Sequence, residues 1–170
     1  VARSLWCVTV APETAAESPD GQVGEIWLQG ANIGRGYWGR PQDTERTFRA
    51  RIHSTLPSGS HTVGARIPGS WLRTGDLGLY LDGELFVTGR IADIVTVDGN
   101  NRYPQDIETT AAQASAIVRR GYAVAFTVAG DGSEGSEGVV IVAERATGTA
   151  RLDLSAATEA IKDTVRRRHG

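Results

Sequence analysis

Residues 77–88 carry the strongest local folding signal in this sequence. Two short runs of alternating apolar residues, 77–81 and 84–88, flank the dipeptide Asp82-Gly83. An Asp-Gly pair between two such runs is typical of a β-hairpin, because the favoured two-residue turn requires positive φ at both central positions. The sequence therefore predicts two antiparallel strands joined by a tight turn.

More strands of the same kind are expected upstream. Residues 5–10 and 25–29 are rich in β-branched and aromatic side chains, as strands are. Between them, residues 18–21 read Ser-Pro-Asp-Gly, in which proline presets φ and glycine accepts a positive φ. These two runs are therefore predicted to pair as antiparallel strands.

The segment that links these strands to the hairpin is less regular. Residues 43–51 have some helical character, whereas residues 54–70 are rich in Ser, Gly and Pro and show no periodicity. We therefore expect a short helix followed by a long loop. Up to about residue 90, the chain is predicted to be mainly twisted antiparallel sheet.

The pattern changes near residue 90. A short apolar strand is expected at residues 94–97, followed by a turn at residues 98–101. Pro104 suits the first turn of a helix, and apolar residues then recur at helical spacing at Ile107, Ala111, Ala114 and Val118. Gly121 is expected to end that helix.

Two further strands, residues 122–128 and 139–144, and a final helix, residues 156–168, complete the prediction. The resulting order of strand, helix, strand, strand and helix indicates a small α+β unit. The whole chain is therefore predicted to be α+β, with an antiparallel β subdomain at residues 1–90 and an α+β domain at residues 91–170.

Composition excludes several classes of function. The 170 residues are 40% hydrophobic and 22% charged, with a net charge of −2, so a core can form and no nucleic-acid partner is expected. There is neither an apolar run of the roughly 18–20 residues that a transmembrane helix needs nor the pattern of a signal peptide. We expect a soluble, cytoplasmic chain.

The cysteine and histidine residues give little support for a metal site or a catalytic nucleophile. Cys7 is the single cysteine, which excludes an internal disulfide and a cysteine-based zinc site. The histidines, His53, His61 and His169, are scattered, so neither a metal site nor a Ser-His-Asp triad is predicted. The run of arginines at residues 166–168 is interpreted as a solvated helix end.

Two charged residues are candidates for ligand binding. Asp76 follows Gly75 in the segment WLRTGD, where a carboxylate can accept hydrogen bonds from a vicinal diol such as ribose. Arg90 lies at the boundary between the two units, and its guanidinium suits phosphate or ribose oxygens. Taken singly, each is equally consistent with an ordinary turn residue or a surface ion pair.

Three segments in order resemble the adenylate-forming superfamily of acyl-CoA synthetases, adenylation domains and luciferase-like enzymes. They are GEIWLQG…GYWGRPQDTERTF at residues 24–48, WLRTGDLG at residues 71–78 and GELFVTGRIADIVTVDGNNRYPQDIE at residues 83–108. Within that superfamily, the segments DGNNRYPQDIE, GYWG and VVIVAERATGT resemble the fatty acyl-AMP ligases. Those enzymes use ATP and Mg²⁺ to convert a fatty acid to an acyl-adenylate. They pass the acyl group to the phosphopantetheine arm of an acyl carrier protein.

The resemblance implies roles for three residues. Asp76 would bind both ribose hydroxyls of the nucleotide, Arg90 would contact the ribose–phosphate region, and Asp93 would lie at the hinge of a mobile C-terminal domain. The family's catalytic lysine belongs to a Gly-Lys motif that would lie beyond Gly170, and Lys162 does not match it. No catalytic residue and no metal ligand is therefore assigned in this chain.

The resemblance also implies that the chain is a piece of a longer enzyme. Residues 1–90 would be the tail of the large adenylating domain, and residues 91–170 most of the mobile domain, so that the piece alone would be inactive. Two alternatives stay open. The parent could be a fatty-acyl-CoA ligase, or the chain could be a module that binds a carrier protein.

Overall fold

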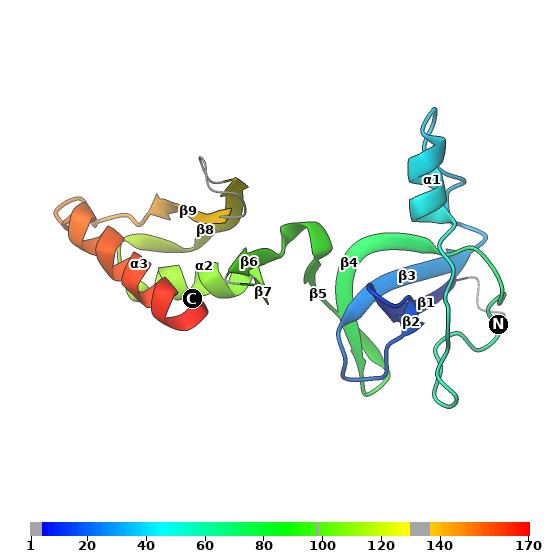
Figure 1. Ribbon diagram of the computed structural model, residues 1–170. Helices are drawn as coiled ribbons and strands as arrows, with labels where there is room; N and C mark the ends of the chain where they lie inside the picture. The colour runs from blue at the N-terminus through cyan, green and yellow to red at the C-terminus, as the bar shows by residue number, and fades with distance from the viewer. Residues whose placement is uncertain (1–4, 98, 130–136) are drawn as a thin grey trace. The chain divides into compact units, whose positions relative to one another are not determined.

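The computed structural model describes residues 5–97, 99–129 and 137–170 of the chain (Figure 1). The chain divides into two compact units, Val1–Ala92, here called the N-terminal unit, and Asp93–Gly170, the C-terminal unit. Helices and antiparallel sheets occur together, which confirms the predicted α+β class. The assignment of these units to the domains of a larger enzyme stays a prediction.

The N-terminal unit is built on a five-stranded sheet in the order β2-β1-β3-β4-β5, in which each strand runs antiparallel to its neighbours. Its strands are β1 (Leu5–Ala11), β2 (Ala16–Glu17), β3 (Gly24–Gly30), β4 (Leu72–Leu81) and β5 (Glu84–Arg90). The predicted pairing of the first two long runs is confirmed as β1 with β3. Strand β2 and the early start of β4 were not predicted.

The hairpin predicted at Asp82-Gly83 joins β4 and β5. Asp82 has φ 51° and Gly83 has φ 80°, as a two-residue turn with positive φ at both positions requires. Leu81 pairs with Glu84 across the turn, and the register continues through Leu79 and Phe86.

One apolar cluster of the N-terminal unit lies on one face of the sheet. Four residues that are at most 2% exposed form it: Val8, Val10, Trp27 and Trp71. Val8 and Val10 are two positions apart on β1, so both point to the same face. Partly buried residues from the irregular segment, including Ala50 and Ile52, pack against this cluster.

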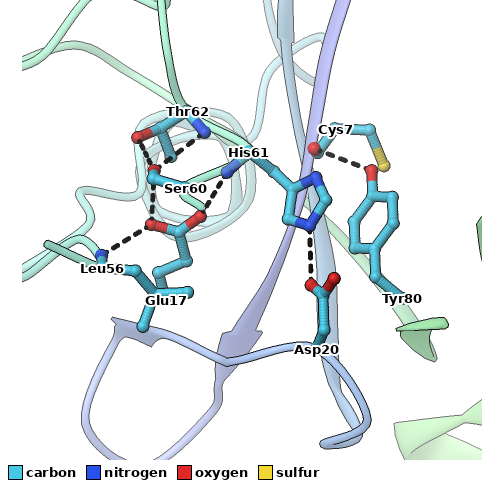
Figure 2. Close-up of polar contacts among 8 residues, drawn as sticks. All are labelled: Cys7, Glu17, Asp20, Leu56, Ser60, His61, Thr62 and Tyr80. Carbon is cyan, nitrogen blue, oxygen red and sulfur yellow. Dashed lines mark hydrogen bonds and ion pairs between the residues drawn. The ribbon is translucent and has the colours of Figure 1, made fainter. Parts of the chain in front are cut away.

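The predicted loop at residues 54–70 contains no strand or helix, but it is not loosely attached. The buried carboxylate of Glu17 accepts hydrogen bonds from the backbone N–H of Leu56 at 2.9 Å, the hydroxyl of Ser60 at 2.7 Å and the backbone N–H of His61 at 2.8 Å (Figure 2). The ring of His61 stacks on Tyr80, with centroids 3.6 Å apart. A sequence-distant carboxylate thus anchors a segment that has no regular structure of its own.

Helix α1 (Pro41–Phe48) precedes this loop and starts two residues before the predicted range of 43–51. Pro41 occupies its first turn, where a missing N–H costs nothing. Thr44 is buried, and its hydroxyl accepts a hydrogen bond from the backbone N–H of Tyr37 at 2.9 Å.

The C-terminal unit combines two hairpins with two α-helices. After the short 3₁₀ helix η1 (Ile91–Asp93), its elements are β6 (Val95–Val97), β7 (Asn100–Arg102), α2 (Pro104–Ala114), β8 (Val118–Ala129), β9 (Glu137–Arg145) and α3 (Leu154–His169). Strand β6 pairs with β7, and β8 pairs with β9. Helix α2 packs against β8 and α3, and Val95, Ile107 and Ala125 form the buried core.

Two local predictions in this unit are wrong. Asn100 and Asn101 were expected in a turn but belong to β7, while Asp98 of the same predicted turn lies outside the described residues. The helix from Pro104 was expected to reach Gly121 but ends at Ala114, and Val118 begins a strand. These errors share one cause, because short-range spacing does not show where tertiary pairing takes over from a helix.

The end of α2 has a local explanation. Ser115 adopts an extended conformation with φ −150°, and its hydroxyl accepts the backbone N–H of Ile117 at 3.3 Å. Serine competes with the helix through such side-chain bonds. Gly121, with φ 76°, lies inside β8, where the register of the β8–β9 pairing shifts between Val118 and Ala123.

No helix in the described ranges is long and apolar enough to cross a membrane.

Candidate functional site

The candidate site lies where β4 bulges between its two neighbours in the sheet. Glu25 pairs with Leu77 and Trp27 pairs with Arg73, so β3 advances two residues while β4 advances four. Strand β4 therefore carries two extra residues around Thr74, Gly75 and Asp76. Bulges of this kind redirect side chains and are frequent beside functional sites.

A buried carboxylate holds the bulge. Glu25 is 1% exposed, and its Oε1 accepts the backbone N–H of Gly75 at 3.1 Å. Its Oε2 lies 2.9 Å from Nε and 2.7 Å from Nη2 of Arg73. One side chain thus accepts a backbone N–H of the bulge and pairs with the guanidinium beside it.

Thr74 completes the bonding of the bulge. Its hydroxyl donates to the backbone carbonyl of Ile26 at 2.8 Å and accepts the backbone N–H of Asp76 at 3.0 Å. Gly75 has φ 76°, a conformation that favours glycine. The bend before Asp76, expected from the Gly-Asp sequence, is therefore present. It lies within strand β4 and is held by the hydrogen bonds of Thr74 and Glu25.

Asp76 and Arg90 meet at the surface beyond this bulge. They are direct partners in the β4–β5 register, and Nε of Arg90 donates to Oδ1 of Asp76 at 2.9 Å. The side chains are 38% and 63% exposed, respectively. The two residues that the sequence singled out for nucleotide binding thus form one exposed pair of opposite charges.

Asp93 is the third predicted site residue. It is exposed, ends the 3₁₀ helix Ile91–Asp93 and is the first residue of the C-terminal unit. Its expected role at a hinge stays a prediction.

Other charged candidates have structural partners. Lys162 pairs with Glu159 at 3.0 Å on the exposed side of α3. The arginine run at residues 166–168 was expected to be a solvated helix end, but Nη1 of Arg168 reaches Oε1 of Gln113 on α2 at 3.2 Å. The last turn of α3 therefore also joins two helices.

His169 makes a contact that the sequence did not predict. Its Nε2 lies 2.9 Å from the buried hydroxyl of Thr110 on α2. Burial, together with the charges of Arg102 and Arg168, lowers the pKa of His169 below its ordinary value of 6.5, against the opposing charge of Asp106. A neutral imidazole at this position fits its hydrogen bond to a hydroxyl group.

The cluster around His61 does not form a catalytic triad. Nε2 of His61 lies 2.8 Å from Asp20, as in a histidine–carboxylate pair, but the hydroxyl of the neighbouring Ser60 donates to Glu17 (Figure 2). The proton of Ser60 is therefore directed to a carboxylate and not to the imidazole that a Ser-His-Asp triad requires. Within residues 5–97, 99–129 and 137–170, there is also no group of three or more His, Cys, Asp or Glu side chains that could hold a metal ion.

Glu25 is the residue of the site that sequence reasoning missed. Residues 24–28 were read as strand and turn without a further role for the glutamate. The available signal was its position, since a charged residue directly before Ile26 and Trp27 in a strand falls where burial is expected.

Comparison with known proteins gives this geometry its context. No protein-family model matches the chain. The long-chain-fatty-acid–AMP ligase FadD32 of Mycolicibacterium smegmatis is 43% identical, over 97% of this chain and 29% of its own length. The 4-hydroxyphenylalkanoate adenylyltransferase of Mycobacterium tuberculosis is 50% identical, over 74% of this chain and 18% of its own length.

The chain is homologous to fatty acyl-AMP ligases of the adenylate-forming superfamily. The crystal structure of ATP-bound MatB from Rhodopseudomonas palustris agrees in fold, with a TM-score of 0.65 and 27% identity over 95% of this chain and 27% of that chain. This homologue of the acyl-AMP ligases spans 29% of the length of FadD32.

Proposed function

We propose that the chain forms part of an ATP-dependent fatty acyl-AMP ligase. The enzyme would join a fatty acid to the α-phosphate of ATP, release pyrophosphate and pass the acyl group to the phosphopantetheine thiol of an acyl carrier protein. The identity with FadD32 supports the class of enzyme. The observation that carries the proposal is the exposed Asp76–Arg90 pair on the bulged strand.

The charges of the pair suit complementary parts of a nucleotide. The carboxylate of Asp76 can accept both hydroxyls of a ribose, because its two oxygens offer about four acceptor positions. Arg90 keeps its positive charge at all physiological pH values and suits the adjacent phosphate. A nucleotide would replace the 2.9 Å contact between the two side chains with contacts of its own.

The remaining parts of the proposal rest on other residues. Asp93 would be part of the hinge between the adenylation and transfer steps. We assign Mg²⁺ to no residue of this chain, since the described residues contain no suitable ligand group. We expect the 170-residue chain alone to form no acyl-adenylate, because its single lysine, Lys162, lies within a helix and does not match the Gly-Lys motif of the family's catalytic lysine.

Nucleotide binding is the first test, on the ¹⁵N-labelled 170-residue chain. Titration with AMP is expected to shift the backbone resonance of Asp76 and the Nε–H resonance of Arg90. Asp76→Ala should weaken AMP binding by about tenfold or more, because a hydrogen bond to a charged group contributes roughly 1.5–3 kcal/mol. Glu84→Ala, which removes an exposed carboxylate at the start of β5 in the same hairpin, is the matched control. Equal AMP affinity of wild type and Asp76→Ala would contradict the assignment.

The activity test uses the natural protein that contains this sequence. It receives ATP, Mg²⁺ and a labelled long-chain fatty acid, and the products are followed after addition of CoA or of holo-carrier protein. Acyl-AMP that persists with CoA but is consumed by carrier protein is the expected result. Conversion to acyl-CoA would favour a CoA ligase. Adenylation of a 4-hydroxyphenylalkanoate instead would correct the substrate class.

A further inference from the structure

Glu25 binds the residue that directly precedes Asp76 of the proposed nucleotide-binding pair. Its carboxylate is almost fully buried, although charged residues are rarely buried unless they are paired. Trp27 and Ile26, its neighbours on β3, are buried apolar residues. An apolar residue would therefore fit the pattern of the strand better than a glutamate does.

The partners of Glu25 lie in the bulge or directly beside it. Gly75 belongs to the bulge and Arg73 is the paired residue next to it, and both donate to this one carboxylate. Because the bulge interrupts the normal pairing with β3, the N–H of Gly75 has lost its usual acceptor there. Glu25 supplies that acceptor from the opposite strand.

The bonds continue from the bulge to the surface pair. Thr74 links the carbonyl of Ile26 to the N–H of Asp76, so the backbone on both sides of Gly75 is fixed. Asp76 is thereby held opposite Arg90 in the β4–β5 register. The buried carboxylate is thus connected to the exposed pair through Gly75, which it binds, and Asp76, which follows Gly75 in the chain.

We infer that Glu25 is a positioning residue for nucleotide binding, an inference that rests on the proposed function. It does not touch the nucleotide. Its carboxylate fixes the bulge at Gly75, so that Asp76 and Arg90 are already arranged before a ribose arrives. Pre-organisation of this kind raises affinity because less ordering remains to be done on binding.

Glu25→Gln in the ¹⁵N-labelled chain tests the inference. Glutamine has the same shape, but it removes the negative charge and turns an amide N–H₂ group toward Arg73 or Gly75. We expect the Gly75 N–H resonance to shift. The Nε–H resonance of Arg90 should also shift, because its hydrogen bond to Asp76 is disturbed, and AMP affinity should fall about tenfold. The chain should still unfold cooperatively.

Glu17→Gln is the matched control. Glu17 is the other buried carboxylate of the same sheet, 5% exposed, and it also accepts several hydrogen bonds, but from the loop at residues 54–70. The Glu17→Gln variant should lose stability, as Glu25→Gln does. Its Arg90 resonance and its AMP affinity should stay as in the wild type. Equal AMP affinity in Glu25→Gln and wild type, or an equal loss in both variants, would overturn the inference.

A second variant decides the outcome if Glu25→Gln does not fold. Arg73→Lys keeps the positive charge beside Glu25 but removes the guanidinium, whose Nε and Nη2 both contact its carboxylate. It should move the Arg90 resonance and weaken AMP binding in the same direction, and unchanged values would again overturn the inference. If the wild-type chain binds no AMP, the nucleotide-binding role fails. The Arg90 resonance then still shows whether Glu25 positions the pair.

Discussion

The two units of the chain differ in the residues that they bury. In the N-terminal unit, Trp27 and Trp71 close an apolar core, and two buried carboxylates, Glu17 and Glu25, each bind segments distant in the sequence. In the C-terminal unit, α2, α3 and the β8–β9 hairpin border an apolar groove of about 580 Å³. Polar bonds in that unit join α2 to α3 through Thr110 and His169, and α2 to β8 through Glu108 and the backbone of Ala125.

Exposed large apolar side chains occur in both units, and in the C-terminal unit most of them lie on the β8–β9 hairpin. Large apolar side chains on β8 and β9 that are at least 40% exposed are Tyr122, Val124, Phe126, Val128 and Val142. On β8 they alternate with residues such as Ala125, which is buried against α2. The comparison teaches that buried carboxylates fix the local geometry of the N-terminal unit, where the candidate nucleotide-binding pair lies, whereas the C-terminal unit gathers most of its exposed large apolar side chains on one hairpin.

The largest expected effect tests the closed core of the N-terminal unit. Trp71→Ala should lower the stability of the N-terminal unit by about 3–5 kcal/mol, because it removes a large side chain from a closed core. All four tryptophans lie in this unit, so tryptophan fluorescence during denaturation reports on it alone. Trp38→Ala, at a fully exposed position, should change stability by less than about 0.5 kcal/mol. Similar losses in both variants would break the comparison.

The next effect tests the polar anchoring of the long loop. Glu17→Ala should cost about 1–3 kcal/mol, because it leaves the N–H groups of Leu56 and His61 without their acceptor. Hydrogen exchange at His61 should accelerate, and proteases should cut the loop sooner. Glu13→Ala, at an exposed position near the start of the same strand, serves as the control. Unchanged exchange at His61 would show that the loop is held without Glu17.

Filling the groove tests the C-terminal unit. Ala157 lines the groove on α3, and Ala157→Leu should raise stability by about 1 kcal/mol through the burial of added methyl and methylene groups. Ala160→Leu adds the same atoms to an exposed position of the same helix and should give no comparable gain. Thermal unfolding followed by helix ellipticity measures both. A loss of stability in Ala157→Leu would mean that the groove cannot accept a side chain.

The smallest effect is a pH dependence confined to the C-terminal unit. The pKa of His169 is below its ordinary value in the folded chain, so the unfolded chain binds more protons when the pH falls below 6.5. Stability should therefore be complete above that pH and decrease as the pH falls toward the folded pKa. Melting between about pH 7 and pH 5 should show this slope, and His169→Gln should flatten it. An equal slope in the variant would assign the effect to other groups.

Local signals predicted much of the fold. The Asp82-Gly83 turn, the strands around it and the antiparallel pairing of β1 with β3 follow from residue type and period. The same reasoning failed at Val118, because an apolar residue at helical spacing is equally suited to begin a strand. Whether Val118 continues the helix or begins a strand depends on its pairing with β9, and short-range spacing carries no information about that pairing.

The candidate site shows the same division. The motifs in the sequence indicated Asp76 and Arg90 separately and did not predict that the two side chains are in contact. Their 2.9 Å contact follows from the register of β4 with β5, and the role of Glu25 follows from the bulge between β3 and β4.

By itself, the sequence determined the α+β class and the hairpin turn, and it singled out Asp76 and Arg90 as candidates, because these depend on local backbone preferences and residue chemistry. Only the tertiary structure decided which charges are buried and what they bind. Glu25 and Arg73 are 48 positions apart, and Glu17 and His61 are 44 apart. A buried carboxylate needs donors to offset its lost hydration, and these donors come within reach only after distant strands and loops have packed together.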